Sequence, residues 1–237
     1  MRLFLIRYSK IVFSYLRLHK LFGFFTGALT NLVYMTKLSA FISRNKGLKN
    51  DFPGKWDYNK RYDFYNWVLL HEGLQDITVQ YMEFGVAQGA SIRWMINQNK
   101  HPESRFHGFD TFTGMPEDFG GVKKGDFNNN DTFPQVDDQR VSFYKGLFQD
   151  TLPGFKTSFT NNQRNVLMMD ADLYSATFYA LSSFAQFLKK GDIIFFDQFA
   201  VPTHEFKAFS EFVESYYIKL ELIGAANNYY FVAFRVA

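Results

Sequence analysis

The chain has 237 residues, of which 47% are hydrophobic and 20% aromatic, so it can form one domain with a large core and an additional segment. It contains no cysteine, which excludes disulfides and thiolate metal sites. Its net charge is +3, but nine of its 26 basic residues lie in residues 1–50, which contain no acidic residue. Residues 51–237 are mildly acidic, so we expect this part of the chain to have no nucleic-acid partner.

Residues 1–20 have the pattern of a basic amphipathic helix. On a helical wheel the five basic residues fall within an arc of roughly 140°, and most apolar side chains lie opposite. Leu3, Ile6 and Phe13 are exceptions among the charges. This pattern is typical of a helix that lies in the plane of a membrane surface.

Residues 21–36 carry no charge, but at sixteen residues the stretch is shorter than the about 20 that a membrane-spanning helix needs. Three interpretations of residues 1–44 stay open. The segment binds an anionic membrane surface, it packs on the body or in a homo-oligomer, or it is a span or signal peptide. The first predicts a cytoplasmic protein that is peripheral on the inner face of the membrane.

Residues 51–63 are polar, contain Pro and Gly, and are expected to connect a helical arm, residues 1–50, to a domain formed by residues 64–237. From residue 64 onward, helical and strand patterns alternate, which predicts a Rossmann-like α/β fold with helices on both faces of a mainly parallel sheet. The last two strands are joined by a short Gly/Asn turn and predict an antiparallel C-terminal hairpin. The seven expected strands are 78–85, 105–110, 141–146, 165–170, 191–197, 219–224 and 229–236. The expected helices are 64–74, 90–99, 175–190 and 204–217.

Acidic residues stand at or near the carboxyl ends of four expected strands: Glu83, Asp110, Asp170 and Asp197. In a parallel sheet these ends meet at one edge, where ligands bind near the point at which the strand order reverses. Burying bare carboxylates is costly, so a ligand or cation is expected to meet them.

Two motifs follow the first two strands. "EFGVAQGAS", residues 83–91, reads as a strand, a tight glycine turn and a helix start, a geometry that lets the backbone approach a ligand. It does not match the dinucleotide fingerprint G-x-G-x-x-G. In "RFHGFDTFTGMP", residues 105–116, Asp110 ends the second strand, where an acid commonly accepts hydrogen bonds from ribose.

Together with "YKGLFQDTLP", "DADLYSAT" and "GDIIFFDQF", these motifs resemble the class I S-adenosylmethionine-dependent methyltransferases, and most closely the macrocin O-methyltransferase family. The resemblance covers about residues 79–200 and excludes the arm. It implies S-adenosylmethionine as cofactor. The residues that it implies around the cofactor are Glu83, Gly85, Gly89 and Ser91 at the methionine end, Asp110 at the ribose, and Gly146 and Phe148 near the adenine.

The resemblance also implies a Mg²⁺ ion bound by Asp170, Asp197 and Gln198, with Asp172 in support and Asp170 as the base. The chain departs from the family here, because Gln198 and Phe199 replace the usual Asp-Tyr. A neutral amide oxygen is still an acceptable ligand for a hard cation. A metal-free site, in which Gln198 only donates and accepts hydrogen bonds, is the alternative.

The function that follows is O-methylation of a sugar or another polyhydroxylated metabolite, lipid-linked if the arm binds membrane. His204 is a rival base or a substrate contact, against the simpler interpretation of a surface histidine. The polar stretch of residues 117–139 is too long for an ordinary connection and favours a lid over the acceptor, with simple disorder as the alternative. The alternative function is a non-catalytic or metal-free homologue that binds the cofactor and serves as a scaffold. A third is an enzyme that uses the same cofactor to methylate nitrogen or carbon.

Overall fold

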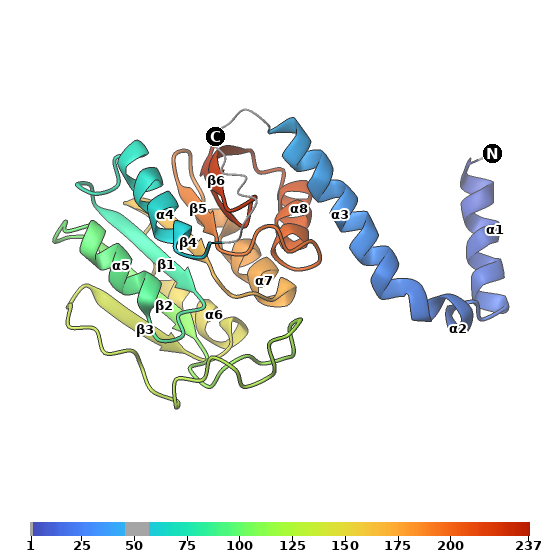
Figure 1. The fold of residues 1–237 in the computed structure, drawn as a ribbon, viewed down its shortest axis with the longest axis horizontal. Helices are drawn as coiled ribbons and strands as arrows, with labels where there is room; N and C mark the ends of the chain where they lie inside the picture. The colour runs from blue at the N-terminus through green and yellow to red at the C-terminus, as the bar shows by residue number, and fades with distance from the viewer. Residues whose placement is uncertain (1, 46–56) are drawn as a thin grey trace.

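The computed structural model describes residues 2–45 and 57–237, so residues 51–56 of the expected connector lie outside the described residues. A seven-stranded sheet with helices on both faces forms the body, and an N-terminal helical arm extends from it (Figure 1). The helices are α1 (Arg2–Tyr15), α2 (His19–Phe22), α3 (Thr26–Arg44), α4 (Lys60–His71), α5 (Ala90–Gln98), α6 (Phe148–Ser158), α7 (Tyr174–Phe184) and α8 (Glu205–Tyr216), with 3-10 turns at Gly23–Phe25 and Ala185–Phe187. The strands are β1 (Val79–Phe84), β2 (Arg105–Asp110), β3 (Val141–Lys145), β4 (Arg164–Met169), β5 (Ile193–Phe196), β6 (Leu220–Ala226) and β7 (Phe231–Val236).

The strand order is β3-β2-β1-β4-β5-β7-β6, and β1 through β5 are parallel to one another. Strand β7 runs antiparallel to both of its neighbours, β5 and β6. The sequence-based prediction of a Rossmann-like sheet that ends in an antiparallel hairpin is therefore confirmed. The strand order reverses between β1 and β4, which places the expected ligand crevice at the carboxyl ends of these two strands.

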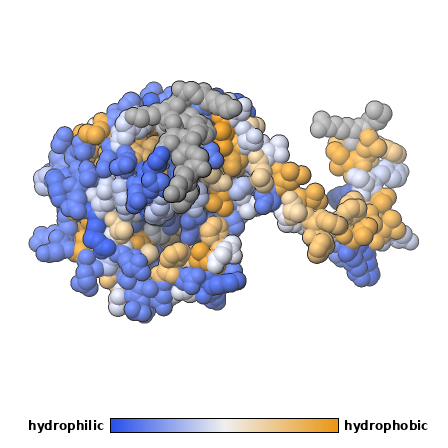
Figure 2. Space-filling model, in the orientation of Figure 1, coloured by the Kyte–Doolittle hydropathy of each residue, from blue (hydrophilic) through white to orange (hydrophobic). Residues whose placement is uncertain are grey.

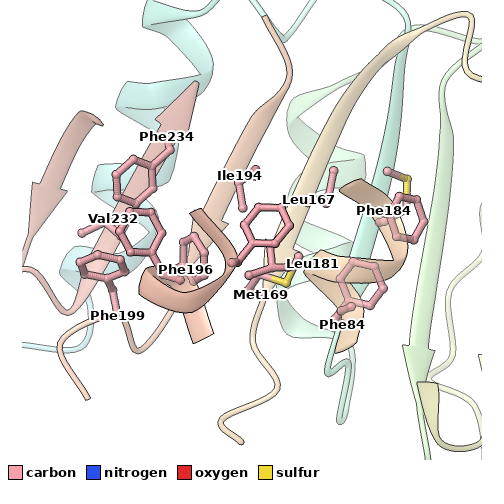
Figure 3. Packing of buried hydrophobic residues seen from close by; sticks show 14 of the residues in the cluster. Phe84, Leu167, Met169, Leu181, Phe184, Ile194, Phe196, Phe199, Val232 and Phe234 are labelled. Carbon is pink, nitrogen blue, oxygen red and sulfur yellow. The ribbon is translucent and has the colours of Figure 1, made fainter. Parts of the chain in front are cut away.

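The central strands are buried on both faces, and their side chains alternate between two hydrophobic clusters. In β5, Phe195 belongs to the cluster under α4 and α5, whereas Phe196 belongs to the one under α6, α7 and α8. Figure 3 shows part of the cluster under α6, α7 and α8, in which the Phe84 ring lies 5.6 Å from that of Phe184 in α7 and the Phe196 ring lies 5.9 Å from that of Phe209 in α8. Continuous apolar strands of this kind are expected when helices cover both faces of a parallel sheet.

Helix α6 was not expected from the sequence. It contains Pro153 and Gly154, two residues that usually argue against a helix interior. Its buried residues Phe148, Leu152 and Phe155 nevertheless follow the i, i+4, i+7 spacing of a helix face. Packing of this face against the sheet outweighs the weak local preference.

The arm differs from the single helix expected over residues 1–20. Helix α1 ends at Tyr15, and Arg17 adopts a left-handed conformation with φ 51° before α2 begins. Figure 1 shows α1 and α2 away from the body, with α3 leading back to it. Among residues 2–45 and 57–237, no helix is long and apolar enough to cross a membrane.

The C-terminal half of α3 packs on the body. Leu38 is buried in the same cluster as the α7 and α8 side chains, and the Phe41 ring lies 5.3 Å from that of Phe199. The Tyr34 hydroxyl donates to Glu211 of α8 at 2.5 Å. This end of the arm is therefore anchored, while the apolar side chains of α1 stay exposed (Figure 2).

Candidate active site

A cavity of about 690 Å³ opens at the carboxyl ends of β1, β2, β4 and β5. Its walls come from the turn after β1, the loops after β2, β3 and β4, and the start of α4. The residues expected at the site that line it are Gly85, Ser91, Asp110, Gly146, Phe148, Asp170, Asp197 and Gln198. Glu83, Gly89 and His204 are not among its lining residues.

The turn after β1 depends on glycine because the backbone passes very close to the end of β4. Gly85 has φ 96°, and a Cβ at this position would lie 1.9 Å from the carbonyl oxygen of Asp170. Gly89 has φ 76° and precedes α5, where a Cβ would lie 2.8 Å from Pro134. Gly85 therefore shapes the cavity wall directly, and Gly89 shapes the turn from outside it.

Asp110 holds this turn in place from the end of β2. Its Oδ2 accepts hydrogen bonds from the backbone N–H groups of Val86 at 2.7 Å and Ala87 at 2.8 Å. Its Oδ1 accepts one from Phe112 at 2.8 Å and a longer one from the Thr111 hydroxyl at 3.4 Å. A carboxylate has about four acceptor positions. A ribose hydroxyl would therefore most easily replace the long Thr111 contact.

Glu83 lies behind the cavity wall instead of in it. Its side chain is buried and accepts a hydrogen bond from the Tyr81 hydroxyl at 2.5 Å. Burial raises the pKa of Glu83 to about 8, and the Tyr81 hydrogen bond only partly opposes this.

Arg61 of α4 lies between the two acids that end β4 and β5. Its Nη2 lies 2.5 Å from Oδ2 of Asp170, and its Nε lies 2.9 Å from Oδ1 of Asp197. Nη2 also donates to the Ser91 hydroxyl at 2.5 Å. Burial lowers the pKa of Arg61, but Asp170 and Asp197 outweigh it and hold the pKa above its usual value, so the guanidinium stays charged.

Two tyrosines complete the surroundings of Asp197. The Tyr65 hydroxyl donates to its Oδ1 at 2.6 Å, and the Tyr58 hydroxyl lies 3.5 Å from its Oδ2. Burial and the nearby Asp170 raise the pKa of Asp197, whereas Arg61 and the Tyr65 hydrogen bond oppose the rise. These partners offset the cost of a carboxylate that is almost fully buried.

Gln198 turns toward a third acid. Its Nε2 donates to Oδ1 of Asp172, and its backbone N–H donates to Glu205 at 2.9 Å. Asp172 is buried, and burial together with Asp170 raises its pKa to about 7. The amide of Gln198 is thus engaged as a hydrogen-bond donor to Asp172.

The three expected metal ligands, Asp170, Asp197 and Gln198, line the same cavity, but both acids contact Arg61 and Gln198 donates to Asp172. Within residues 2–45 and 57–237, no group of three or more His, Cys, Asp or Glu side chains is arranged to hold a metal ion. The guanidinium of Arg61 already lies between Asp170 and Asp197, where a cation would have to bind both. The residues present therefore do not fit Mg²⁺ in this arrangement.

His204 lies just before α8 and outside the cavity lining. Its ring packs edge-on against Phe119 at 4.6 Å, and its Nδ1 accepts a long hydrogen bond from the Tyr174 backbone at 3.4 Å. Burial lowers its pKa. These contacts agree with a packing role near the loop after β2.

Arg61 and the tyrosines around it were not predicted as site residues. Tyr58, Arg61 and Tyr62 lie in residues 51–63, which read as a connector, and Tyr65 was expected only as part of the helix over residues 64–74. A usable signal was present in "YNKRYDFY": Arg61 has tyrosines three positions before it and four after it. On a helix these positions share a face, so the pattern indicates a cation held among aromatic rings.

Comparison with known proteins agrees with the fold. The model of the macrocin O-methyltransferase (TylF) family matches residues 122–232. The calicheamicin methyltransferase CalS11 is 18% identical, with 86% of this chain and 91% of that chain covered and a TM-score of 0.58. The O-methyltransferase NovP is 16% identical, with 89% and 99% covered and a TM-score of 0.57.

A second structure, the apo form of CalS11, described as a TDP-rhamnose 3'-O-methyltransferase, is 19% identical over 86% of this chain and 93% of that chain, with a TM-score of 0.54. At these identities the solved structures establish the fold. No curated protein sequence matches the chain.

Proposed function

We propose that this chain, a class I S-adenosylmethionine-dependent methyltransferase of the macrocin O-methyltransferase family, methylates a hydroxyl of a sugar or another polyhydroxylated metabolite. The observation that carries the proposal is one cavity in which the glycine turn, Asp110 and Asp170 meet. Ligands of open α/β sheets bind at this edge of the sheet.

The cavity fits S-adenosylmethionine in size and in chemistry. Its volume of about 690 Å³ lies within the range of small-molecule sites. Bound there, the cofactor supplies a methyl group on a positively charged sulfur. In this proposal Gly85 and Ser91 face its methionine end, Asp110 accepts from the ribose, and Gly146 and Phe148 flank the adenine. Glu83 and Gly89 then support the turn from behind.

Asp170 is the group that we assign as proton acceptor. Its side chain lines the cavity and is 20% exposed, whereas that of Asp197 is 2% exposed. We prefer it to His204, which does not line the cavity. Near neutral pH an alcohol holds its proton tightly, so a positioned base is needed.

In the proposed reaction the methyl group moves from the sulfur of the cofactor to the acceptor oxygen. The acceptor O–H bond breaks and its proton passes to Asp170, while the oxygen bonds to the methyl carbon. The carbon–sulfur bond breaks and its electron pair stays on sulfur. The products are the methyl ether, S-adenosylhomocysteine and a protonated Asp170, which returns the proton to water. The protein mainly aligns the oxygen, carbon and sulfur atoms.

The acceptor is expected to carry both apolar and hydroxylated surfaces. Met115, Pro116 and Phe127 of the loop after β2 line the cavity next to Glu117, so apolar and charged side chains share this wall. A deoxysugar has this mixture. The description of CalS11 as a TDP-rhamnose 3'-O-methyltransferase supports a nucleotide-linked deoxysugar as the first acceptor to try.

We also propose that residues 1–25 bind an anionic membrane surface. Phe4, Ile11, Leu16 and Phe24 are between 58% and 89% exposed, and residues 1–25 contain five basic residues and no acid. Apolar area combined with positive charge favours a surface of anionic lipid headgroups. A lipid-linked acceptor would then be methylated at that surface.

Titration calorimetry with S-adenosylmethionine, in buffer containing EDTA, tests the cofactor site, and release of S-adenosylhomocysteine with TDP-rhamnose tests the reaction. Binding with release supports the transferase. Binding of S-adenosylmethionine without release of S-adenosylhomocysteine in the presence of any sugar acceptor favours the second candidate, a scaffold homologue. The replacement of the usual Asp by Gln198 is the sequence feature that supports this second candidate. Absence of binding would contradict both.

A further inference from the structure

The strongest unexplained feature of the site is a buried arginine in contact with two of its acids. Arg61 approaches Asp170 at 2.5 Å and Asp197 at 2.9 Å, and its side chain is only 6% exposed. The two acids follow neighbouring strands, β4 and β5, and both line the cavity. A single cation therefore joins the two strand ends at the floor of the site.

The position of the guanidinium is fixed from several sides. Arg61 lies in the first turn of α4, and its carbon Cζ lies over the rings of Tyr58, Tyr62 and Tyr65 at 5.5, 5.5 and 5.8 Å. Tyr65 is fully buried and its hydroxyl reaches Asp197. The aromatic cage, the ion pairs and the hydrogen bonds that Arg61 donates to the hydroxyls of Ser91 and Tyr58 hold the guanidinium in place.

Charge explains why a guanidinium and a divalent ion exclude one another here. Two carboxylates side by side repel one another, and a cation that contacts both stabilises their ionised forms. Arg61 supplies that cation, and a metal bound to the same oxygens would lie within a few ångströms of it and be repelled. The third expected ligand, Gln198, presents its amide nitrogen to Asp172.

We propose that Arg61 takes the place of the metal ion in this site and that methyl transfer by this chain needs no divalent cation. The inference rests on the proposed function, because it concerns the surroundings of the residue assigned as the base. Arg61 acts as a positioning residue: it holds the side chain of Asp170 at the wall of the cavity. The atom and proton balance of the transfer is unchanged, with Asp170 receiving the hydroxyl proton.

The test uses Mn²⁺, whose electron paramagnetic resonance signal reports binding, and the full-length chain. The wild type, Arg61→Lys and the control Arg164→Ala should bind no Mn²⁺ at millimolar concentration. Arg164 is matched because it is ion-paired with a buried acid, Glu72, at 2.7 Å, but lies at the opposite end of β4. Arg61→Ala leaves the two acids without their cation. Its dissociation constant for Mn²⁺ should therefore be at least roughly tenfold lower than that of the wild type, whose binding stays below detection.

Wild-type Mn²⁺ binding that disappears in Asp197→Asn would overturn the inference, and so would a folded Arg61→Ala that gains no affinity. If Arg61→Ala does not fold, Mn²⁺ binding by the wild type and by Arg61→Lys is sufficient to test the inference. Loss of methyl transfer by the wild type in EDTA, restored by Mg²⁺, would also overturn it. Failure of the proposed function would instead appear as absent S-adenosylmethionine binding, whatever the Mn²⁺ result.

Discussion

Nη2 of Arg61 lies 2.5 Å from Oδ2 of Asp170, so residues 109 positions apart in sequence form one ion pair in the wall of the cavity. The contact ties α4, which covers one face of the sheet, to the carboxyl end of β4. It makes the stability of the site depend on an arginine that the strands themselves do not supply.

The variant Arg61→Ala should therefore lower the free energy of unfolding by about 3–5 kcal/mol, because it leaves the buried Asp197 and the partly exposed Asp170 without their cation. Urea denaturation followed by circular dichroism measures the change. Lys123→Ala is the control, since Lys123 pairs with Asp118 at 3.1 Å on the surface and its removal should have no measurable effect. Equal stability of Arg61→Ala and the wild type would show that the ion pair does not hold the site together.

Asp170→Asn should reduce methyl transfer by about 10²–10⁴-fold, because the amide cannot accept the hydroxyl proton. The affinity for S-adenosylmethionine should stay within a few fold of the wild type, since the other cavity residues are unchanged. Single-turnover release of S-adenosylhomocysteine and titration calorimetry separate the two effects. Full turnover by this variant would reject Asp170 as the base.

Gly85→Ala should abolish S-adenosylmethionine binding, because the added Cβ would lie 1.9 Å from the carbonyl oxygen of Asp170 and force the turn away from β4. Gly73→Ala is a matched control. Gly73 also has a positive φ, 63°, but no atom lies within 4 Å of the added Cβ. The control should lose only about 1–2 kcal/mol of stability and still bind the cofactor. Normal binding by Gly85→Ala would contradict this geometry.

Because Glu83 is buried, we expect the free energy of unfolding of the cofactor-free protein to depend on pH. Its folded-state pKa is raised to about 8 from an ordinary value of 4.5, mainly by burial. The folded state therefore holds a proton that the unfolded state has released, and Glu83 makes stability fall by a few kcal/mol as the pH rises through this interval.

Glu83→Gln keeps an acceptor for the Tyr81 hydroxyl but removes the titration, so above pH 8 it should be more stable than the wild type. Chemical denaturation of both proteins between pH 5 and about pH 9 measures the difference, and other titrating groups cancel in the comparison. Parallel curves for the two proteins would mean that Glu83 is ionised in the folded state at neutral pH.

Deleting residues 1–25 should abolish flotation with anionic liposomes and leave the fold intact, because the anchoring contacts of the arm come from Tyr34, Leu38 and Phe41 farther along α3. Neutral phosphatidylcholine vesicles serve as the control for charge. If the full-length chain stays at the bottom of the gradient with anionic lipid, the membrane proposal is rejected.

The sheet was predictable because its strands are apolar, short and separated by turn residues, and a parallel order then follows from the alternation with helices. The break of the arm at Arg17 was not, since the amphipathic pattern of residues 1–20 continues through it. Helix α6 was hidden by Pro153 and Gly154, although its buried residues keep helical spacing.

The candidate site was predictable where topology alone gathers residues: acids that end parallel strands must meet at one edge. Glu83 sits one residue before the end of β1, and the alternation of the strand turns its side chain behind the wall. Arg61 lies in a segment of polar composition, and its pairing with acids more than 100 residues away depends on how α4 packs, which local patterns do not encode.

Titration of S-adenosylmethionine into the full-length protein in the presence of EDTA decides whether the cavity at the ends of the parallel strands holds a methyl donor. We expect one cofactor molecule to bind per chain, with the same affinity when Mg²⁺ replaces EDTA. A chain that binds no cofactor under either condition would contradict the assignment of this cavity as a methyl-donor site.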